Sequence, residues 1–226
     1  MSFFQTCGTV STILEAPWFL VIDGIGTLAF AFYGALRAVR LGAPLGGILL
    51  MAAFPAVGGG LMRDMILSRH PVGFLSTPLY GCLILFAGLC VYFVYKYKTK
   101  LLSFDDSFCM RWILPAMDAL GLATFTILGI AVASLQGVCP LWFWGPFFGC
   151  LTSCGGGILS GLLVEGADFL IRPNIDLRVA VPWSILLAIL FFAIDTKGWP
   201  VNVTFLALLG IFGILVSRLF VFLIKR

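Results

Sequence analysis

Residues 23–34 read DGIGTLAFAFYG, and residues 118–129, DALGLATFTILG, repeat that pattern at a constant offset of 95. The matching positions are Asp23, Gly26, Phe30 and Gly34 against Asp118, Gly121, Phe125 and Gly129. A triple glycine follows each stretch, at residues 58–60 and 155–157, with an offset of 97. Four matches in one register, followed by a matching triple glycine, indicate an internal repeat.

The composition places this repeat in a membrane. Of the 226 residues, 61% are hydrophobic and 11% are charged, against about 25% charged in ordinary soluble domains. The mean hydropathy is +1.11. So few charges could not cover the surface of a soluble fold, which excludes a soluble enzyme, a disordered chain and a nucleic-acid-binding protein.

Seven stretches are long and apolar enough to cross the hydrocarbon core, which takes about 20 residues as a helix. They lie at about residues 17–36, 43–66, 76–95, 112–134, 141–164, 179–195 and 199–220. Residues 119–164 carry no charge, so they must hold two spans, with the turn at Gln136, Gly137 and Pro140. The predicted fold is an all-α membrane protein with seven transmembrane helices.

Each unit of the repeat contains three spans, an odd number, so the second copy must be inverted relative to the first. Repeat 1 covers about residues 17–98 and repeat 2 about residues 112–196, while the seventh helix, about 199–220, lies outside the repeat. Inverted repeats with sites near the midplane recur in transport proteins. We expect residues 1–226 to form one membrane domain with its site where the repeats meet.

The basic residues predict the orientation. With the N-terminus outside, eleven Lys and Arg residues fall on the inner side and three on the outer side, a strong positive-inside bias. The eleven are Arg37, Arg40, Lys96, Lys98, Lys100, Arg111, Arg172, Arg178, Arg218, Lys225 and Arg226, and the three are Arg63, Arg69 and Lys197. The C-terminus is therefore expected in the cytosol. No basic stretch precedes the first span, so no signal peptide is expected.

The triple glycines are the first candidate site residues: Gly58, Gly59, Gly60, Gly155, Gly156 and Gly157. Each glycine costs about 1 kcal/mol relative to alanine in a helix interior. Close helix packing is one interpretation. Three adjacent glycines cover every side of a helix, so we favour kinked, locally opened helices whose carbonyl groups line a pore. Alanine at Gly59 and Gly156 would then straighten both helices at little cost in stability.

Charged residues inside the spans are the second set of candidates. Asp23, Arg63 and Asp64 fall in the outer part of the membrane, where each is costly and therefore a functional hypothesis. Asp64 and Arg63 point about 100° apart on one helix, so Asp23 is the expected partner of Arg63, either in a pore or in a purely structural bridge. In repeat 2, Ser160 replaces the arginine, which leaves Asp118 without the corresponding partner and free to attract cations.

Enzyme and metal chemistry lack the necessary residues. The only histidine, His70, is expected in the outer loop, out of reach of a membrane serine. Asp23 and Asp118 fall at opposite membrane faces and cannot form an aspartyl pair. The seven cysteines lack CxxC spacing, which argues against a disulfide framework or a zinc site. We expect neither enzymatic activity nor a bound metal or cofactor.

Two motifs carry a resemblance to a known family. Residues 118–122 (DALGL) followed by Phe125, and residues 58–64 (GGGLMRD), resemble the prokaryotic branch of the trimeric intracellular cation (TRIC) channels, which also includes proteins labelled as glycine transporter-like. The resemblance covers about residues 18–218. It implies a homotrimer in a prokaryotic plasma membrane. It also implies that each subunit has its own pore for K+ and, less selectively, Na+, with helices kinked at the triple glycines. Bacterial relatives often carry Arg-Asp after both triple glycines, and Ser160-Gly161 departs from that pattern.

The predicted function is therefore a monovalent cation channel with a pore in each protomer. A secondary transporter of glycine or another small amino acid is the alternative, and a non-conducting scaffold would leave the cost of Arg63 and Asp64 unexplained. Small-residue faces that include Gly145 and Gly149 are expected at the trimer interface. Membrane lipids are the other expected partners, with Lys96, Lys98 and Lys100 as possible headgroup contacts.

Overall fold

The computed structural model describes residues 17–97, 114–166, 175–197 and 202–224. Over these residues, seven helices are long and apolar enough to cross a membrane. They are α2 (Pro17–Arg40), α3 (Leu45–Ile66), α4 (Leu79–Tyr97), α5 (Leu114–Leu135), α6 (Leu141–Glu165), α8 (Ile175–Lys197) and α9 (Val203–Ile224). A short 3-10 helix, η1 (Gly73–Leu75), precedes α4. The prediction of an all-α protein with seven transmembrane helices is confirmed.

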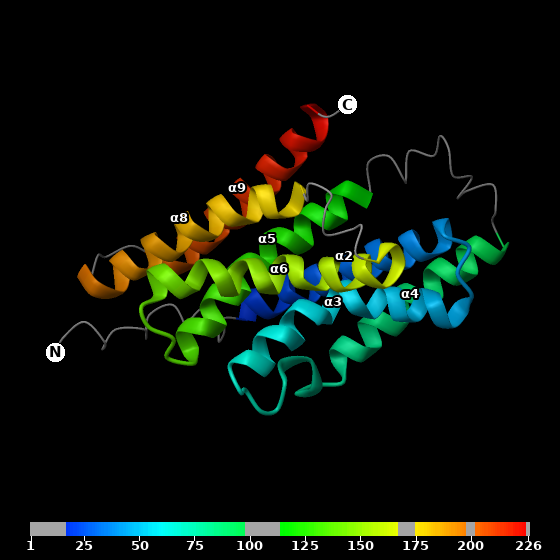
Figure 1. Ribbon diagram of the computed structural model, residues 1–226, viewed down its shortest axis with the longest axis horizontal. Helices are drawn as coiled ribbons and strands as arrows, with labels where there is room; N and C mark the ends of the chain where they lie inside the picture. The colour runs from blue at the N-terminus through cyan, green and yellow to red at the C-terminus, as the bar shows by residue number, and fades with distance from the viewer. Residues whose placement is uncertain (1–16, 98–113, 167–174, 198–201, 225–226) are drawn as a thin grey trace.

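The helices run roughly along the long axis of the molecule, and the chain reverses direction between consecutive helices (Figure 1). One end carries the connection between α3 and α4, residues 67–78, and the connection between α5 and α6. We call it the α3–α4 end. The opposite end carries residues 41–44, which join α2 to α3, and we call it the α2–α3 end.

The connection between the first and second helices is built in the same way in both repeats. Gly42 after α2 and Gly137 after α5 have φ of 69° and 71°, a left-handed conformation that favours glycine. In each turn the residue after the glycine donates its N–H to the carbonyl five residues earlier, at 3.1 and 3.0 Å. Pro44 and Pro140 are then the N-cap residues of α3 and α6. The turn chemistry therefore repeats along with the sequence.

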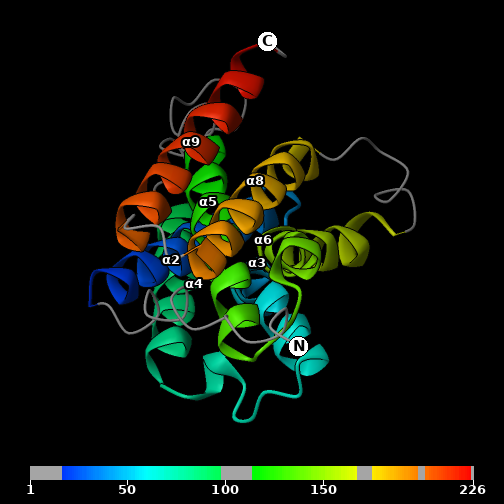
Figure 2. The same cartoon turned by 90° about the vertical axis from the view of Figure 1, so that its left-hand side faces the viewer.

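The third helices of the two repeats also bury the same face. Within α4 and α8 the buried positions recur at an offset of 100: Ile84, Ala87, Gly88 and Val91, then Ser184, Leu187, Ala188 and Phe191. The inverted three-helix repeat is therefore visible in the packing. The seventh helix, α9, packs against α5 and α8 of the second repeat (Figure 2).

The triple glycines lie where α3 and α6 cross. A Cβ added to Gly59 would overlap the carbonyl oxygen of Thr152, and one added to Gly156 would lie 2.6 Å from the carbonyl oxygen of Pro55. The two contacts are equivalent in the repeat, because the offset of 97 relates Gly59 to Gly156 and Pro55 to Thr152. The two helices therefore approach backbone to backbone around an approximate two-fold axis.

This crossing corrects the expectation of locally opened helices. Both α3 and α6 continue as α-helix through their glycines. Close packing, the alternative interpretation, explains Gly58, Gly59, Gly155 and Gly156, because the added Cβ of each would lie within 3.2 Å of the opposite helix. The expected tolerance of alanine at Gly59 and Gly156 is reversed, since there is no room for the methyl groups.

Gly145 and Gly149 also lie elsewhere than expected. Both are buried inside the protomer, where an added Cβ would meet Ala188 at 2.8 Å and Ser184 at 3.1 Å, respectively. These glycines let α6 approach α8. They are therefore not available for a trimer interface.

Candidate functional site

A cavity of about 230 Å³ lies at the α3–α4 end, between α2, α3, η1, the start of α4, and α5. Its polar and charged lining residues are Asp23, Thr27, Arg63, Asp64, Arg69, Ser76, Tyr80 and Thr152. Thr152 belongs to α6 and is the residue whose carbonyl faces Gly59 at the helix crossing. The cavity therefore extends from one end of the bundle to the place where the two repeats meet.

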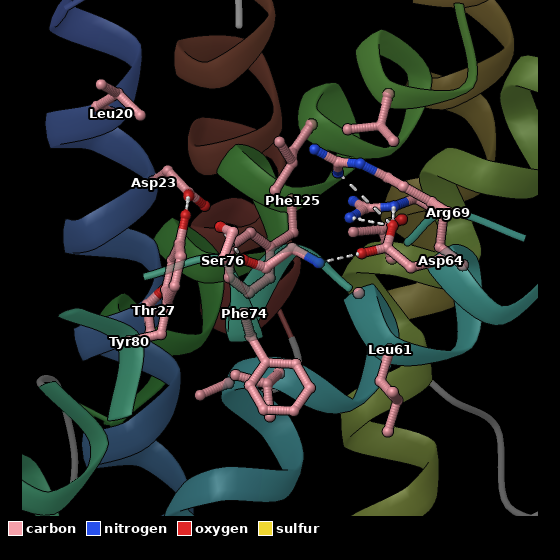
Figure 3. Close-up of a pocket in the computed structure, with 18 of the residues that line it drawn as sticks. Leu20, Asp23, Thr27, Leu61, Asp64, Arg69, Phe74, Ser76, Tyr80 and Phe125 are labelled. Atoms are coloured by element: carbon pink, nitrogen blue, oxygen red, sulfur yellow. Dashed lines mark hydrogen bonds and ion pairs between the residues drawn. The ribbon is translucent and has the colours of Figure 1, made fainter. Parts of the chain in front are cut away.

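Arg63 and Asp64 form a buried ion pair on the last turns of α3. Asp64 Oδ1 accepts from Nε of Arg63 at 2.8 Å, and Nη2 of Arg63 lies 2.8 Å from the same oxygen. Asp64 Oδ2 accepts from the backbone N–H of Gly73 at 2.7 Å, and Arg69 Nη1 lies 3.8 Å from Oδ1 (Figure 3). Asp64 therefore neutralises Arg63 and also ties the α3–α4 connection to the cavity wall.

This pairing corrects the prediction that Asp23 binds Arg63 directly. Asp23 instead accepts a hydrogen bond of 2.5 Å from the hydroxyl of Tyr80 at the start of α4. Figure 3 shows Asp23 with Tyr80 on one side of the cavity and Asp64 with Arg69 on the other. The 100° between adjacent helical residues did not prevent the Arg63–Asp64 contact, because the long arginine side chain reaches back to its neighbour.

Two buried polar atoms of the cavity remain unpartnered among the described residues. They are Oδ1 of Asp23 and Nη1 of Arg63. The two residues are 5% and 3% exposed and both line the cavity. Because a buried polar group without a partner is costly, these atoms indicate where a ligand or water would be held.

The second repeat has a different arrangement of charge. Ser160 donates to the carbonyl of Gly157 in its own helix at 3.0 Å. Asp118 forms an ion pair with Arg218 of α9, with 2.5 Å between Nη2 and Oδ2. The prediction that Asp118 carries an uncompensated charge is therefore wrong, because the helix outside the repeat supplies the missing arginine.

The third glycine of each triplet differs from the first two. Gly60 lines the cavity, and an added Cβ would meet only Arg63 Nη2, at 3.7 Å. Gly157, its equivalent in repeat 2, has no described atom within 4 Å of an added Cβ. Among the six glycines of the two triplets, Gly60 and Gly157 are therefore the two that have room for an added Cβ.

The predicted lipid contacts are described only in part. Lys96 is exposed at the end of α4, with its Nζ 5.7 Å from the ring centre of Tyr92 and 5.8 Å from that of Tyr97. Lys98 and Lys100 lie outside the described residues.

Sequence reasoning missed Tyr80, Arg69 and Arg218 as site residues. Tyr80 stands in the first turn of an expected span on the same side as Asp23, and this shared depth was a usable signal. Arg69 and Arg218 were counted only for orientation. Their roles depend on the connection after α3 and on the packing of α9, which no local pattern reveals.

Two inverted three-helix repeats that cross at glycines beside a charged cavity are typical of membrane proteins of the channel or transporter type. A family model described as "Glycine transporter" matches residues 20–96 and 115–195. The chain belongs to this family.

Curated relatives support the same family. The UPF0126 membrane protein of Vibrio cholerae is 31% identical over 175 residues, which cover 77% of this chain and 69% of the relative. The UPF0126 inner membrane protein YadS of Escherichia coli K12 is 30% identical over 171 residues, which cover 76% of this chain and 78% of the relative.

Solved structures share the fold. The TRIC trimeric intracellular cation channel orthologue from Rhodobacter sphaeroides aligns with a TM-score of 0.75 at 26% identity, covering 93% of this chain and all of that one. A structure from a study of conductance through TRIC cation channels aligns with a TM-score of 0.74 at 25% identity, covering 92% and 94%. The resemblance to the prokaryotic TRIC branch is confirmed.

Proposed function

We propose that this chain is a monovalent cation channel, conducting K+ and less selectively Na+, whose path runs inside each protomer between the two repeats. The observation that carries the proposal is the cavity that reaches Thr152 at the crossing of α3 and α6. The solved TRIC cation channels of the same fold support it.

The charges of the cavity suit the passage of a cation. An isolated guanidinium in a low-dielectric wall would repel K+ strongly. Asp64 removes this obstacle by pairing with Arg63 at 2.8 Å. The free Oδ1 of Asp23 then offers an oxygen ligand to an ion that has lost part of its hydration shell.

The orientation follows from the basic residues. Arg37, Arg40 and Lys96 stand at the ends of α2 and α4, at the α2–α3 end of the bundle. By the positive-inside rule this end faces the cytosol, so the cavity opens to the outside and the N-terminus is outside. The Escherichia coli relative, an inner membrane protein, supports a location in a bacterial inner membrane.

The assembly is a homotrimer with one path in each protomer. The likeness to the trimeric intracellular cation channel orthologue from Rhodobacter sphaeroides supports this. Anionic lipid headgroups are the expected partners of Lys96 and of the two lysines that follow it in sequence, at about 1 kcal/mol each.

Recording from planar bilayers tests the channel. Purified protein in symmetric KCl should give single-channel currents, and a KCl/NaCl gradient should give a reversal potential that favours K+. Gly60→Phe should abolish the current by filling the cavity. Gly46→Phe is the matched control, because Gly46 is exposed and has no described atom within 4 Å of an added Cβ. No unitary current from the parent protein, or equal currents from both variants, would contradict the proposal.

A second candidate function, transport of a small zwitterionic amino acid, is favoured by the two unpartnered atoms. Nη1 of Arg63 can donate to a carboxylate, and Oδ1 of Asp23 can accept from an ammonium group. The cavity of about 230 Å³ has room for a small molecule that carries both a carboxylate and an ammonium group. The name of the family model, Glycine transporter, supports this candidate.

Uptake into proteoliposomes separates the two candidates. A transporter should give slow, saturable glycine uptake that methylamine and acetate, each carrying one of the two charged groups, inhibit poorly. Asp23→Asn and Arg63→Gln should each abolish that uptake. Unitary currents without saturable uptake would support the channel alone.

A further inference from the structure

The repeat relates the cavity to a second half of the protomer at the α2–α3 end. The offset of 97 maps Gly60 of the cavity wall to Gly157 and Val57 to Cys154. Gly157 borders open space, whereas Cys154 is 3% exposed. In the second half, therefore, α6 has room for a side chain at Gly157, whereas Cys154, about one turn earlier, is buried.

An ion pair stands at the mouth of this second half. Nη2 of Arg37 donates to Oε1 of Glu165 at 2.7 Å. Arg37 lies near the end of α2 in repeat 1, and Glu165 is the last residue of α6 in repeat 2. The side chains are 19% and 29% exposed, so the pair is at the boundary between the bundle and its surroundings.

The equivalent mouth at the α3–α4 end has no such bridge. The offset of 95 relates Arg37 to Val132, which lines the open cavity. The offset of 97 relates Glu165 to Ser68, in the turn that follows α3. The Arg37–Glu165 ion pair therefore breaks the two-fold symmetry of the repeats. It links a helix of repeat 1 to a helix of repeat 2.

We propose that the Arg37–Glu165 ion pair is the gate at the α2–α3 end of the path. This inference rests on the proposed path between the two repeats. When the pair is formed, it holds the ends of α2 and α6 together and closes the space beside Gly157. When it separates, α2 and α6 part and that space connects to the cytosol.

Thiol labelling tests the gate without requiring conduction. Cys154 is a native reporter, so a variant that keeps only this cysteine is labelled in inside-out vesicles with a membrane-impermeant, cationic methanethiosulfonate reagent. Arg37→Gln and Glu165→Gln should each raise the labelling rate about two- to fivefold, the range for breaking a partly exposed pair. The charge swap Arg37→Glu with Glu165→Arg should return the rate to that of the parent.

Arg40→Gln is the matched control, since it removes the same charge from the exposed last residue of α2 and should leave the rate unchanged. Gly157→Cys is a second reporter for any gate variant that does not fold in the Cys154 background, because Gly157 has room for a side chain. Equal rates in the parent and both single variants, or no restoration by the charge swap, would overturn the gate. Faster labelling without ion currents would keep the gate and refute the channel.

Discussion

Asp64 is the residue on which the charge balance of the cavity depends. Its two oxygens accept from Arg63 and from the N–H of Gly73, and Arg69 lies within ion-pair distance. Asp23, in contrast, accepts only from Tyr80 among the described residues. Asp64 therefore makes more stabilising interactions than Asp23, although both carboxylates lie at the same end of the bundle.

Asp64→Asn should destabilise the protein far more than Asp23→Asn. Breaking a buried ion pair costs about 3–5 kcal/mol because it leaves an uncompensated charge. Losing a charge-assisted hydrogen bond while keeping a carbonyl acceptor costs about 1 kcal/mol. Thermal unfolding in detergent measures both changes. Similar losses for the two variants would contradict this account of the cavity.

A double-mutant cycle identifies the partner of Arg63. Arg63→Gln combined with Asp64→Asn should show a coupling free energy of about 1–3 kcal/mol, as contacting charges do. Arg63→Gln combined with Asp23→Asn should be additive within about 0.5 kcal/mol. Stronger coupling to Asp23 would restore the pairing that the sequence predicted.

At the scale of helices, glycines decide how closely α3 and α6 approach. Gly59→Ala and Gly156→Ala should each destabilise the protein by about 1–3 kcal/mol, because the methyl group would overlap backbone of the opposite helix. Gly60→Ala and Gly157→Ala are the matched controls and should be neutral or stabilising by up to about 1 kcal/mol. Denaturant unfolding of the four variants gives the comparison, and equal effects would show that the crossing is not the constraint.

The helix outside the repeat is held by an ion pair as well as by packing. Arg218 of α9 pairs with Asp118 of α5, and Trp183 of α8 donates to the hydroxyl of Ser217 at 3.0 Å. Asp118→Asn should therefore expose α9 to limited proteolysis, and Arg218→Gln on the same background should cause little further change. Unchanged proteolysis in Asp118→Asn would mean that apolar packing alone fixes α9.

The helices themselves could be predicted, and their contacts largely could not. Runs of about 20 apolar residues fix the spans because the bilayer thickness requires that length. The repeated Asp, Gly, Phe and Gly positions revealed the repeat, and the odd number of spans in each unit required its inversion. The tight crossing was missed because three glycines look alike in sequence, although two face backbone and one faces the cavity. The partners of Arg63 and Asp118 depend on side-chain reach and on α9, which lies outside the repeat.

At the scale of the whole molecule, cross-linking or native mass spectrometry in mild detergent should show a trimer. Gly145→Ala should not change the trimer selectively, because this glycine packs against Ala188 within the protomer. Instead it should lower the unfolding temperature of each subunit. A clean monomer or dimer from the parent protein would contradict the proposed assembly.

The ion pairs described above also bear on the response to voltage. Arg37–Glu165, Arg63–Asp64 and Asp118–Arg218 each join one acid to one base. One elementary charge that crosses the full membrane field gains about 2.3 kcal/mol per 100 mV. A pair that moves as a unit gains nothing, since the forces on its two members cancel. Helix movements that keep Arg63–Asp64 and Asp118–Arg218 intact would carry almost no gating charge, so any dependence of the open probability on membrane potential should come from the separation of Arg37 and Glu165.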